Sequence, residues 1–406
     1  MASQAVTTQN DIGEMISVSD ALDRLFGLAT PVGTELVPLA HASGRVLAED
    51  AVARRTQPPF PASAMDGYAV RAKEALAGQA LAVAGESAAG RGWHHPLPDG
   101  AAVRIFTGAP VPEGADSILI QEDATRDGDT ITVTEAPKPG AYIRPAGGDF
   151  SAGQTLTAPR RLTPRDVALL AAMNIPKVLV SRKPVVALIP TGDELVLPGE
   201  EPGSDQIVSS NNFGLAAMLE SIGATPQLCP IARDNATSLE NALEQARNAD
   251  VIITLGGASV GDHDLVAEVL GNKGLTLNFY KIAMRPGKPL MAGRIANSMM
   301  VGLPGNPVSA IVCGEVFVRP AVEKMMGFPG APRETRPGQL AHDLDANGPR
   351  EHYMRASVAS DGACTVFERQ DSSLVRVLSD ANALVVRAPN APPSKLGEEV
   401  RYIPLQ

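Results

Sequence analysis

The spacing of apolar residues predicts two short amphipathic helices in the first half of the chain. Over residues 17–29 apolar side chains recur every three or four positions, and Ser17 or Ser19 is suited to cap the helix. A second helix is predicted over residues 162–173, with Thr163 as its N-cap and a proline in the first helical position. Both segments are short, so they are expected to pack against other elements.

Between these helices the pattern changes to short β-like runs. Residues 51–140 contain alternating apolar stretches that are separated by Gly, Pro and Asp-Gly turns, and the Asp127-Gly128 pair predicts a hairpin. We therefore expect a small β-rich domain here.

From about residue 181 to 327 apolar strands alternate with helical patterns. This rhythm predicts a parallel sheet with helices on both faces. The last helix is expected to be long and to follow residues 302–306. Beyond residue 327 the short apolar runs, among them Val-Arg-Val-Leu at 375–378, are interpreted as strands of a small C-terminal barrel or sheet.

Composition and charge narrow the classes of function. The chain has 406 residues and a net charge of −10, which disfavours binding to nucleic acid or to an anionic membrane. Its three cysteines are far apart, so neither a disulfide framework nor a zinc site is expected. The N-terminal segment has no secretory pattern and no apolar run approaches membrane-helix length, which predicts a cytoplasmic protein.

Two strand-to-helix junctions of the α/β region carry acidic or glycine-rich loops, and ligands bind at such junctions. Residues 189–195 read Ile-Pro-Thr-Gly-Asp-Glu-Leu, which is either an acidic turn or a loop that brings Glu194 to a crevice. Residues 255–264 place three glycines around Ser259, where backbone N–H groups can face an oxyanion. Asp262 and Asp264 in this loop are suitable oxygen ligands for a divalent metal.

Two further junctions carry cations and a helix start. Residues 284–289 frame Arg285 and Lys288 with prolines and a glycine, and Lys281 lies just upstream. This is the local basic cluster that an acidic protein needs to bind an anion. At residues 302–309 Asn306 is predicted to cap a helix, although capping alone does not account for the Gly-Leu-Pro-Gly that precedes it.

The β-rich region offers carboxylates and a hydroxyl on stiff loops. Asp66 follows a proline-rich segment, Thr107 lies on a Gly- and Pro-framed turn, and Asp149 follows a glycine pair. Each loop alone is more typical of a turn than of a site. Acidic loops in one domain and cationic loops in another suit a metal-bound, phosphate-containing substrate held between them.

Seven segments together resemble one family. PPFPASAMDGYAV, RIFTGAPVPEGAD, IRPAGGD, PTGDEL, GGASVGDHD, MRPGKP and GLPGNPVSA occur in this order. They resemble the molybdopterin molybdenumtransferases, which are the bacterial MoeA enzymes and the E domains of gephyrin and its plant counterpart. The resemblance extends from about residue 17 to 404.

The resemblance implies a multidomain α/β and β fold in a homodimer. The implied parts are a linking domain of residues 1–50 and 141–180, a β-rich domain of residues 51–140, a molybdopterin-binding-like α/β domain of residues 181–330, and a C-terminal β-barrel of residues 331–406. The implied active site lies between the α/β and barrel domains of one subunit and the β-rich domain of the other.

The resemblance also implies a reaction in which adenylylated molybdopterin, molybdate and Mg²⁺ give molybdenum cofactor and AMP. Catalytic roles are implied for Asp66, Thr107, Asp149, Glu194, Asp234 and Asp264, of which Asp66, Asp149, Glu194 and Asp264 are the implied metal ligands. Positions that bind substrate or molybdate are Gly256, Gly257, Ser259, Lys281, Arg285, Lys288, Asn306, Ser309, Arg355 and Ser372. Possible partners are the adenylyltransferase that makes the substrate, and apo-molybdoenzymes or their chaperones.

The chain departs from the family pattern at two positions. Arg285 stands where the family often has lysine, which keeps the charge but changes its geometry. Asp371 precedes Ser372 where the family has glycine, so a carboxylate lies beside a hydroxyl that is expected to meet an anion. The choice between Arg350 and Arg355 as the pocket arginine stays open, and Arg355 is preferred.

Two other functions are compatible with parts of the sequence. The adenylyltransferase that makes the activated pterin has a similar sheet domain and glycine-rich loop, but it does not need the loops of Asp66, Thr107 and Asp149 or a C-terminal barrel. A scaffold protein that clusters a membrane receptor can use the same fold, but this chain shows no extra domain for that purpose. Both alternatives are therefore ranked below the molybdenumtransferase.

Overall fold

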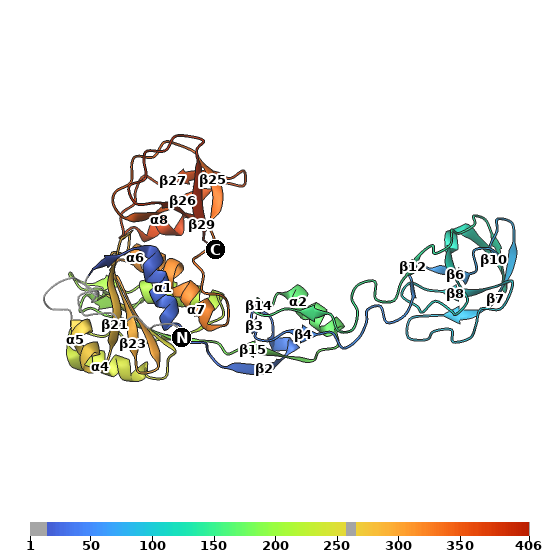
Figure 1. Ribbon diagram of the computed structural model, residues 1–406, viewed down its shortest axis with the longest axis horizontal. Helices are drawn as coiled ribbons and strands as arrows, with labels where there is room; N and C mark the ends of the chain where they lie inside the picture. The colour runs from blue at the N-terminus through green and yellow to red at the C-terminus, as the bar shows by residue number, and fades with distance from the viewer. Residues whose placement is uncertain (1–13, 257–264, 406) are drawn as a thin grey trace, which may run out of the picture.

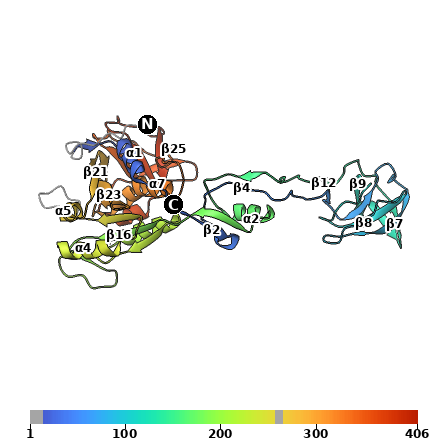
Figure 2. The ribbon, with the colours of Figure 1, turned by 60° about the horizontal axis from the view of Figure 1, so that its bottom comes forward.

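The computed structural model describes residues 14–256 and 265–405 as an elongated molecule. An α/β domain and a β-barrel lie together at one end, a six-stranded sheet lies at the other, and a narrow linking region joins them (Figure 1). The view in Figure 2 shows the same separation from another side. The two ends of one chain are therefore far apart.

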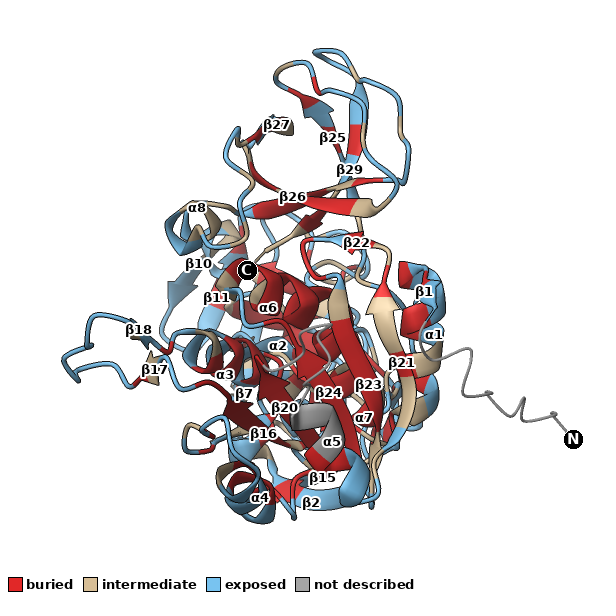
Figure 3. Ribbon diagram, turned by 90° about the vertical axis from the view of Figure 1, so that its left-hand side faces the viewer, coloured by how far each residue is buried: buried red, intermediate tan, exposed pale blue. Residues whose placement is uncertain are grey.

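The α/β domain is built on a seven-stranded sheet in the order β1-β21-β23-β24-β20-β16-β19. The four strands from β24 to β19 are mutually parallel, as predicted, whereas β23 runs antiparallel to both of its neighbours. The residues of β20 and β24 are buried throughout, which explains their continuous apolar sequence (Figure 3). The strands are β1 (Met15–Ile16), β16 (Val185–Pro190), β19 (Thr225–Leu228), β20 (Val251–Leu255), β21 (Thr276–Ile282), β23 (Pro289–Ile295) and β24 (Ser298–Leu303).

Helices cover both faces of this sheet. Val186 and Leu188 of β16 belong to one buried cluster and Ala187 and Ile189 to another, as alternating side chains of a strand must. The first cluster includes residues of α1, α3, α6 and α7, and the second includes residues of α4 and α5. The helices are α1 (Val18–Leu28), α3 (Asn211–Ser221), α4 (Ala236–Gln245), α5 (Leu265–Asn272), α6 (Pro307–Cys313) and α7 (Arg319–Met325).

The N-terminal helix forms where the sequence predicts it. Ser17 is the N-cap, and its hydroxyl accepts a hydrogen bond from the N–H of Asp20 at 3.0 Å. The strand β1 pairs with β21, and the apolar face of α1 lies in the core of the α/β domain. Residues 15–28 thus pack with the α/β domain, although they fall within residues 1–50, which the resemblance assigns to the linking domain.

The linking region has its own small core around a four-stranded sheet, β14-β3-β15-β2, and helix α2. Thr163 caps α2 and forms a reciprocal capping box with Asp166, which confirms the predicted helix start. Two narrow ribbons, β4–β13 and β5–β12, lead toward the far end of the molecule. The elements are β2 (Thr34–Pro38), η1 (Leu39–His41), β3 (Val46–Leu47), β4 (Ala51–Val52), β5 (Ala62–Ser63), β12 (Ile143–Arg144), β13 (Thr155–Leu156), β14 (Arg160–Arg161), α2 (Pro164–Ala172) and β15 (Lys177–Ser181).

The far end is the predicted β-rich domain, a six-stranded sheet in the order β10-β11-β7-β8-β6-β9. The predicted hairpin joins β10 to β11, with Asp127 opposite Thr130, and Gly128 adopts the positive φ that a tight turn requires. The elements are β6 (Gly67–Val70), β7 (Ala80–Ser87), β8 (Ala101–Ile105), β9 (Ser117–Ile120), η2 (Gln121–Asp123), β10 (Ala124–Asp127) and β11 (Thr130–Val133).

The C-terminal region is a closed five-stranded barrel. Its strands pair in the ring β26-β27-β25-β29-β28, and β28 pairs back to β26. The strand β22 pairs with β26 and so connects the α/β domain to the barrel. Residues 375–378 were predicted as a strand, which is wrong, because they belong to the short helix α8 that contacts α6. The elements are β22 (Met284–Arg285), β25 (Arg336–Leu340), β26 (Glu351–Val358), β27 (Ala363–Val366), α8 (Val375–Ser379), β28 (Ala383–Arg387) and β29 (Glu399–Pro404).

The long helix predicted after residue 306 is interrupted. Between α6 and α7 the chain forms the π-helical turn η3 (Gly314–Val318). Pro320 follows this turn and has no N–H to donate to the carbonyl four residues earlier, so a regular α-helical bond is missing there. The altered turn brings Glu315 and Arg319 into a nearly buried ion pair at 3.4 Å.

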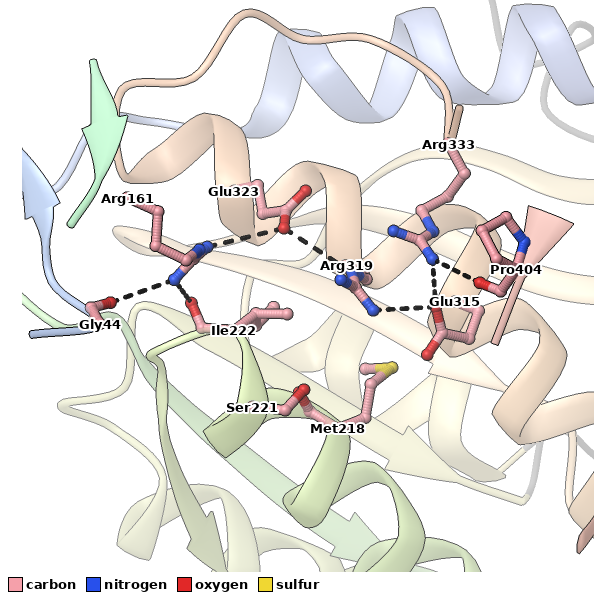
Figure 4. A network of polar contacts seen from close by, with 10 residues as sticks. All are labelled: Gly44, Arg161, Met218, Ser221, Ile222, Glu315, Arg319, Glu323, Arg333 and Pro404. Atoms are coloured by element: carbon pink, nitrogen blue, oxygen red, sulfur yellow. Dashed lines mark hydrogen bonds and ion pairs between the residues drawn. The ribbon is translucent and has the colours of Figure 1, made fainter. Parts of the chain in front are cut away.

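Five charged side chains form a continuous row that we call the Arg-Glu chain (Figure 4). Glu315 pairs with Arg319 and with Arg333, each at 3.4 Å. Glu323 pairs with Arg319 at 3.7 Å and with Arg161 at 3.6 Å. Burial lowers the pKa of the Arg161 and Arg333 guanidiniums, and the neighbouring glutamates oppose this shift.

The ends of the Arg-Glu chain reach three parts of the protein. Arg161, on β14 of the linking domain, donates to the carbonyls of Ile222 at 2.6 Å and of Gly44 at 3.3 Å. Arg333 donates to the carbonyl of Pro404, in the last barrel strand, at 3.0 Å. The Arg-Glu chain therefore connects the linking domain and the barrel to the α/β domain (Figure 4).

Candidate active site

A cavity of about 1010 Å³ lies at the carboxyl ends of β16, β20 and β24. Parallel strands end at the same edge of a sheet, and ligands bind at that edge in α/β folds. Of the residues singled out from the sequence, Glu194, Asp234, Gly256 and Asn306 line the cavity.

The acidic wall of the cavity comes from two adjacent loops. Glu194 lies on the loop that joins β16 to β17 (Leu195–Val196), and Asp234 follows β19. Gly192 has a φ of +141°, and a Cβ atom at this position would lie 2.2 Å from Oε2 of Glu194. The carboxylate thus folds over Gly192, whose positive φ favours glycine. The segment predicted as an acidic turn or a site forms part of the cavity wall.

The next strand end also requires glycine. Gly256, directly after β20, has a φ of +104°, and a Cβ atom there would lie 2.8 Å from the carbonyl oxygen of Thr191. Three other residues of the predicted site, Gly257, Ser259 and Asp264, lie outside the described residues.

The opposite wall is the start of α6 together with a loop of the barrel domain. Asn306 occupies the N-cap position, but its side chain makes no capping hydrogen bond, contrary to the prediction. Its Nδ2 instead donates to Oγ of Ser372 at 3.1 Å, and the N–H of Val308 donates to the carbonyl of Ser372 at 3.1 Å. Ser309 is buried in the first turn of α6. The barrel loop is therefore fixed on the N-terminus of this helix.

The carboxylate of Asp371 does not pair with Ser372. It accepts hydrogen bonds from the N–H of Ser373 at 2.9 Å and from Oγ of Ser373 at 2.6 Å. These bonds lower the pKa of Asp371. The departure from the family pattern at Asp371 thus leaves the hydroxyl of Ser372 directed to Asn306, and Ser373 lines the cavity.

The predicted cations lie on the strands beside this wall rather than in the lining of the cavity itself. Lys281 of β21 is paired in register with Pro289, which does line the cavity. Arg285 of β22 lies opposite His352 of β26, and the carbonyl of Lys288 accepts a bond from Ile282. The backbone of these residues therefore lies close to the strand β22, which connects the α/β domain to the barrel.

Arg355 is the largest side chain in the described structure that is completely buried. Its Nη2 donates to the carbonyls of Asp371 at 3.0 Å and of Arg369 at 3.3 Å. Its Nε and Nη1 have no hydrogen-bond partner among the described residues. Arg350 instead donates to the carbonyl of Met284 at 3.3 Å. Neither arginine lines the cavity, so the preference for Arg355 over Arg350 as the pocket arginine stays a prediction.

Asp66 and Thr107 contact each other in the β-rich domain. Oδ1 of Asp66 accepts bonds from the N–H and from the hydroxyl of Thr107, both at 2.7 Å. The N–H of Thr107, followed by its hydroxyl, lowers the pKa of Asp66. The guanidinium of Arg104 stacks over Tyr68 and Phe106 next to this pair. Asp66 is thus a half-buried carboxylate with a fixed orientation.

Of the predicted metal ligands, Asp66, Asp149 and Glu194 are described by the structure, and they are not brought together within one chain. Asp66 and Thr107 lie next to β6 and β8, at the opposite end of the molecule from the cavity (Figure 1). Asp149 lies between β12 and β13, where its N–H donates to the carbonyl of Gln57 at 3.1 Å. In the described parts of the chain no group of three or more His, Cys, Asp or Glu side chains is placed to hold a metal ion.

Comparison with known proteins identifies the family. The MoeA N-terminal region (domain I and II) matches residues 16–174, a probable molybdopterin-binding domain matches residues 187–324, and the MoeA C-terminal region (domain IV) matches residues 337–405. A molybdopterin molybdenumtransferase of a Nostoc species is 37% identical over 359 residues, 85% of this chain and 82% of that protein. This chain belongs to the MoeA family. The molybdopterin molybdenumtransferase of Haemophilus influenzae is 40% identical over 317 residues, 77% of this chain and 78% of that protein.

The solved structures agree with the MoeA assignment. A molybdopterin biosynthesis MoeA protein from Pyrococcus horikosii is 30% identical, with a TM-score of 0.82 that covers 97% of this chain and 100% of that one. The predicted multidomain fold with a C-terminal barrel is confirmed. Within the described residues, no helix is long and apolar enough to cross a membrane.

Three residues of the cavity wall were missed by reasoning from the sequence. Asn211, at the start of α3, donates from Nδ2 to the carbonyl of Gly305 at 2.7 Å. Arg233 and Ser373 each neighbour a predicted site residue and also line the cavity. For these two, adjacency to Asp234 and Ser372 was the available signal, whereas Asn211 lies in a helix that no motif marks.

Proposed function

We propose that this MoeA-family protein is a molybdopterin molybdenumtransferase. It inserts molybdenum, supplied as molybdate, into adenylylated molybdopterin and releases AMP, and so acts in molybdenum cofactor biosynthesis. One observation carries the proposal: a cavity at the carboxyl edge of the sheet is lined by Glu194 and Asp234 and also by the α6 start, where Asn306 is bonded to Ser372. Family membership supports the same conclusion.

The acidic wall suits a magnesium ion that accompanies a pyrophosphate. Mg²⁺ usually keeps several waters and binds through one or two carboxylates together with the phosphates of its substrate. Glu194 and Asp234 are two carboxylates on one cavity, so the donor set fits this mode. When bound, Mg²⁺ would neutralise charge on the phosphoanhydride. The two carboxylates would hold it, and that of Glu194 lies over Gly192.

The junction of the α/β domain and the barrel suits molybdate, a compact dianion. Arg355 is buried with free donors, and Arg285 and Lys288 lie on the adjoining strand and loop. Guanidinium, ammonium and hydroxyl donors form strong charge-assisted bonds to oxyanions. Ser309 and Ser372 supply hydroxyls at the start of α6, where the helix dipole also favours an anion.

The active form is a homodimer in which the β-rich domain of one subunit completes the cavity of the other. Asp66 and its partner Thr107 lie at the far end of the chain from Glu194 and Asp234 (Figure 1). A second subunit is the simplest source of an Asp66 carboxylate for this cavity.

The direct test incubates purified protein with adenylylated molybdopterin, Mg²⁺ and molybdate, and follows AMP release and cofactor formation. We expect molybdate-dependent AMP release that is lost in Asp66→Asn and needs more molybdate in Arg285→Ala. A folded protein that releases no AMP contradicts the proposal, and the adenylyltransferase reaction and partner searches would then be the next tests.

Sharing of the site between subunits is tested by mixing. Asp66→Asn and Glu194→Gln subunits are each inactive alone, but a mixed dimer contains one cavity with both native carboxylates. We expect co-refolded mixtures to regain about a quarter of wild-type activity per subunit. A mixture as inactive as its components would refute a shared site while leaving the reaction itself open.

A further inference from the structure

Arg233 lies in the wall of the cavity but points its guanidinium at protein backbone. Its Nη1 donates to the carbonyls of Leu195 at 3.0 Å, of Asp193 at 3.1 Å and, more weakly, of Gly192 at 3.4 Å. These three carbonyls belong to the loop that carries Glu194. One cationic group therefore holds this loop on both sides of Glu194.

The opposite loop contributes contacts in return. Oδ1 of Asp193 accepts a bond from the N–H of Asp234 at 3.1 Å, and the N–H of Gly192 donates to the carbonyl of Ala232 at 3.0 Å. Three kinds of contact thus join the two loops. The guanidinium of Arg233 bonds to carbonyls of the Glu194 loop, the carboxylate of Asp193 bonds to the N–H of Asp234, and Gly192 bonds to Ala232 through the backbone.

Arg233 is itself anchored to a regular element. Its N–H donates to Oγ of Ser238 at 2.9 Å, and Ser238 lies in the first turn of α4, whose N-cap is Asn235. Residues on helices and strands hold a site more accurately than loops do. The helix α4 is therefore the fixed support from which Arg233 reaches the loop of Glu194.

The loop needs such support because of its own sequence. Gly192 adopts a φ of +141° and its carbonyl is one of the three acceptors, while the carboxylate of Glu194 rests against the same glycine. Glycine loses more conformational freedom on ordering than any other residue. Without Arg233, this loop loses three of its bonds and keeps others, among them those of Gly192 to Ala232, of Asp193 to Asp234 and of Glu194 to Ile207.

We propose that Arg233 is a positioning residue of this site: it clamps the loop of Glu194 against the loop of Asp234 and so sets the separation of the two carboxylates. This inference rests on the proposed function, in which that pair receives Mg²⁺ and the pyrophosphate of the substrate. We assign Arg233 a positioning role because its Nη1 is engaged by the backbone carbonyls of the Glu194 loop.

The test compares Arg233→Ala and Arg233→Lys with a matched control, Arg247→Ala. Lysine keeps a cationic donor for the carbonyls, so it should rescue most of the effect. Arg247 lies just beyond the end of α4, has 65% of its side chain exposed and pairs only with Glu244 in the described structure, so it leaves both loops unchanged.

The first readout needs no substrate. Hydrogen exchange of the ligand-free protein is measured by mass spectrometry for peptides over residues 190–197 and 231–235. We expect Arg233→Ala to exchange at least about tenfold faster in both peptides, Arg233→Lys to stay within about threefold of wild type, and Arg247→Ala to be unchanged. Unchanged exchange in Arg233→Ala overturns the proposal.

The second readout is the Mg²⁺ dependence of AMP release. We expect Arg233→Ala to raise the half-saturating Mg²⁺ concentration about tenfold with the half-saturating molybdate concentration unchanged, and lysine to restore it. A loss of maximal rate at an unchanged Mg²⁺ requirement would assign Arg233 to direct contact with substrate and overturn the positioning role. If wild type releases no AMP while exchange still accelerates in Arg233→Ala, the proposed function fails and the clamp stands.

Discussion

Replacing Glu315 with glutamine tests how strongly the Arg-Glu chain joins the domains. Glu315 is 8% exposed and faces Arg319 and Arg333, each at 3.4 Å. At an effective dielectric constant of about 20, a pair of unit charges about 4 Å apart is worth roughly 4 kcal/mol before the cost of burial is subtracted. Removing one partner of a buried pair typically costs about 3–5 kcal/mol, because the other charge stays buried without compensation.

The choice of glutamine, which keeps a hydrogen-bond acceptor, places the expected loss at the lower end of this range. Three arginines face two glutamates in the row, so the substitution leaves Glu323 as the one glutamate of the row that pairs with an arginine. Glutamine retains a carbonyl oxygen that can still accept a hydrogen bond from either guanidinium. We therefore expect the free energy of unfolding of the α/β and barrel domains to fall by about 3 kcal/mol.

Chemical denaturation followed by two probes measures this change. The only tryptophan, Trp93, lies between β7 and β8 of the β-rich domain, so its fluorescence reports the far end of the chain. Far-UV circular dichroism reports mainly the helices of the α/β domain. Glu315→Gln should shift the circular dichroism transition to lower denaturant and leave the fluorescence transition in place.

An exposed ion pair of the same spacing provides the control. Arg376 and Asp380 are also four residues apart, but their side chains are 87% and 52% exposed. Asp380→Asn should change the free energy of unfolding by less than about 0.5 kcal/mol. The reasoning is refuted if Glu315→Gln is no more destabilising than this control, because the buried chain would then contribute no more than a surface pair.

Three further outcomes follow from local contacts. Thr107→Val removes the hydroxyl bond to Asp66 but keeps the N–H bond. Carboxyl NMR should therefore show that the pKa of Asp66 rises toward its ordinary value, and an unchanged or lower pKa would contradict this assignment. Gly67→Ala would place a Cβ atom 2.0 Å from the carbonyl of Leu119 and should lower the stability of the β-rich domain, read from tryptophan fluorescence, by at least about 2 kcal/mol. Burial, and then the charge of Arg285, lowers the pKa of His352 to about 4 from 6.5. Between these values the unfolded state binds a proton that the folded state does not, so stability should fall as pH drops from about 6.5 to about 4, and His352→Gln should flatten this slope.

The predictable part of the fold rests on signals that are local in sequence. Ser17 and Thr163 cap helices where the spacing of apolar residues begins, and the Gly128 turn lies between two alternating runs. The apolar run at residues 375–378 carries no such boundary signal, and a helix rather than a strand forms where it contacts α6. Short apolar runs are ambiguous for this reason.

The site was predictable as a set of residues and not as an arrangement. Glu194 and Gly256 could be placed because they end apolar strands, and strand ends of a parallel sheet meet. The contact of Asn306 could not be predicted, because its side chain bonds to Ser372, 66 positions later, and does not cap its own helix. Arg233 was not predicted, because its side chain bonds to three backbone carbonyls and no sequence motif marks such contacts.

The Arg-Glu chain and the divided site are linked by the shape of the molecule. Only two narrow ribbons connect the linking domain to the β-rich domain, so the direction of the linking domain sets where Asp66 lies. Arg161 holds that domain through the carbonyl of Ile222 and through Glu323. If a partner's cavity must receive Asp66, loosening this contact misplaces the carboxylate without touching the cavity. Arg161→Met should therefore lower AMP release at saturating Mg²⁺ and molybdate while hydrogen exchange of the Glu194 loop stays as in wild type, whereas Arg233→Ala should show the reverse pattern.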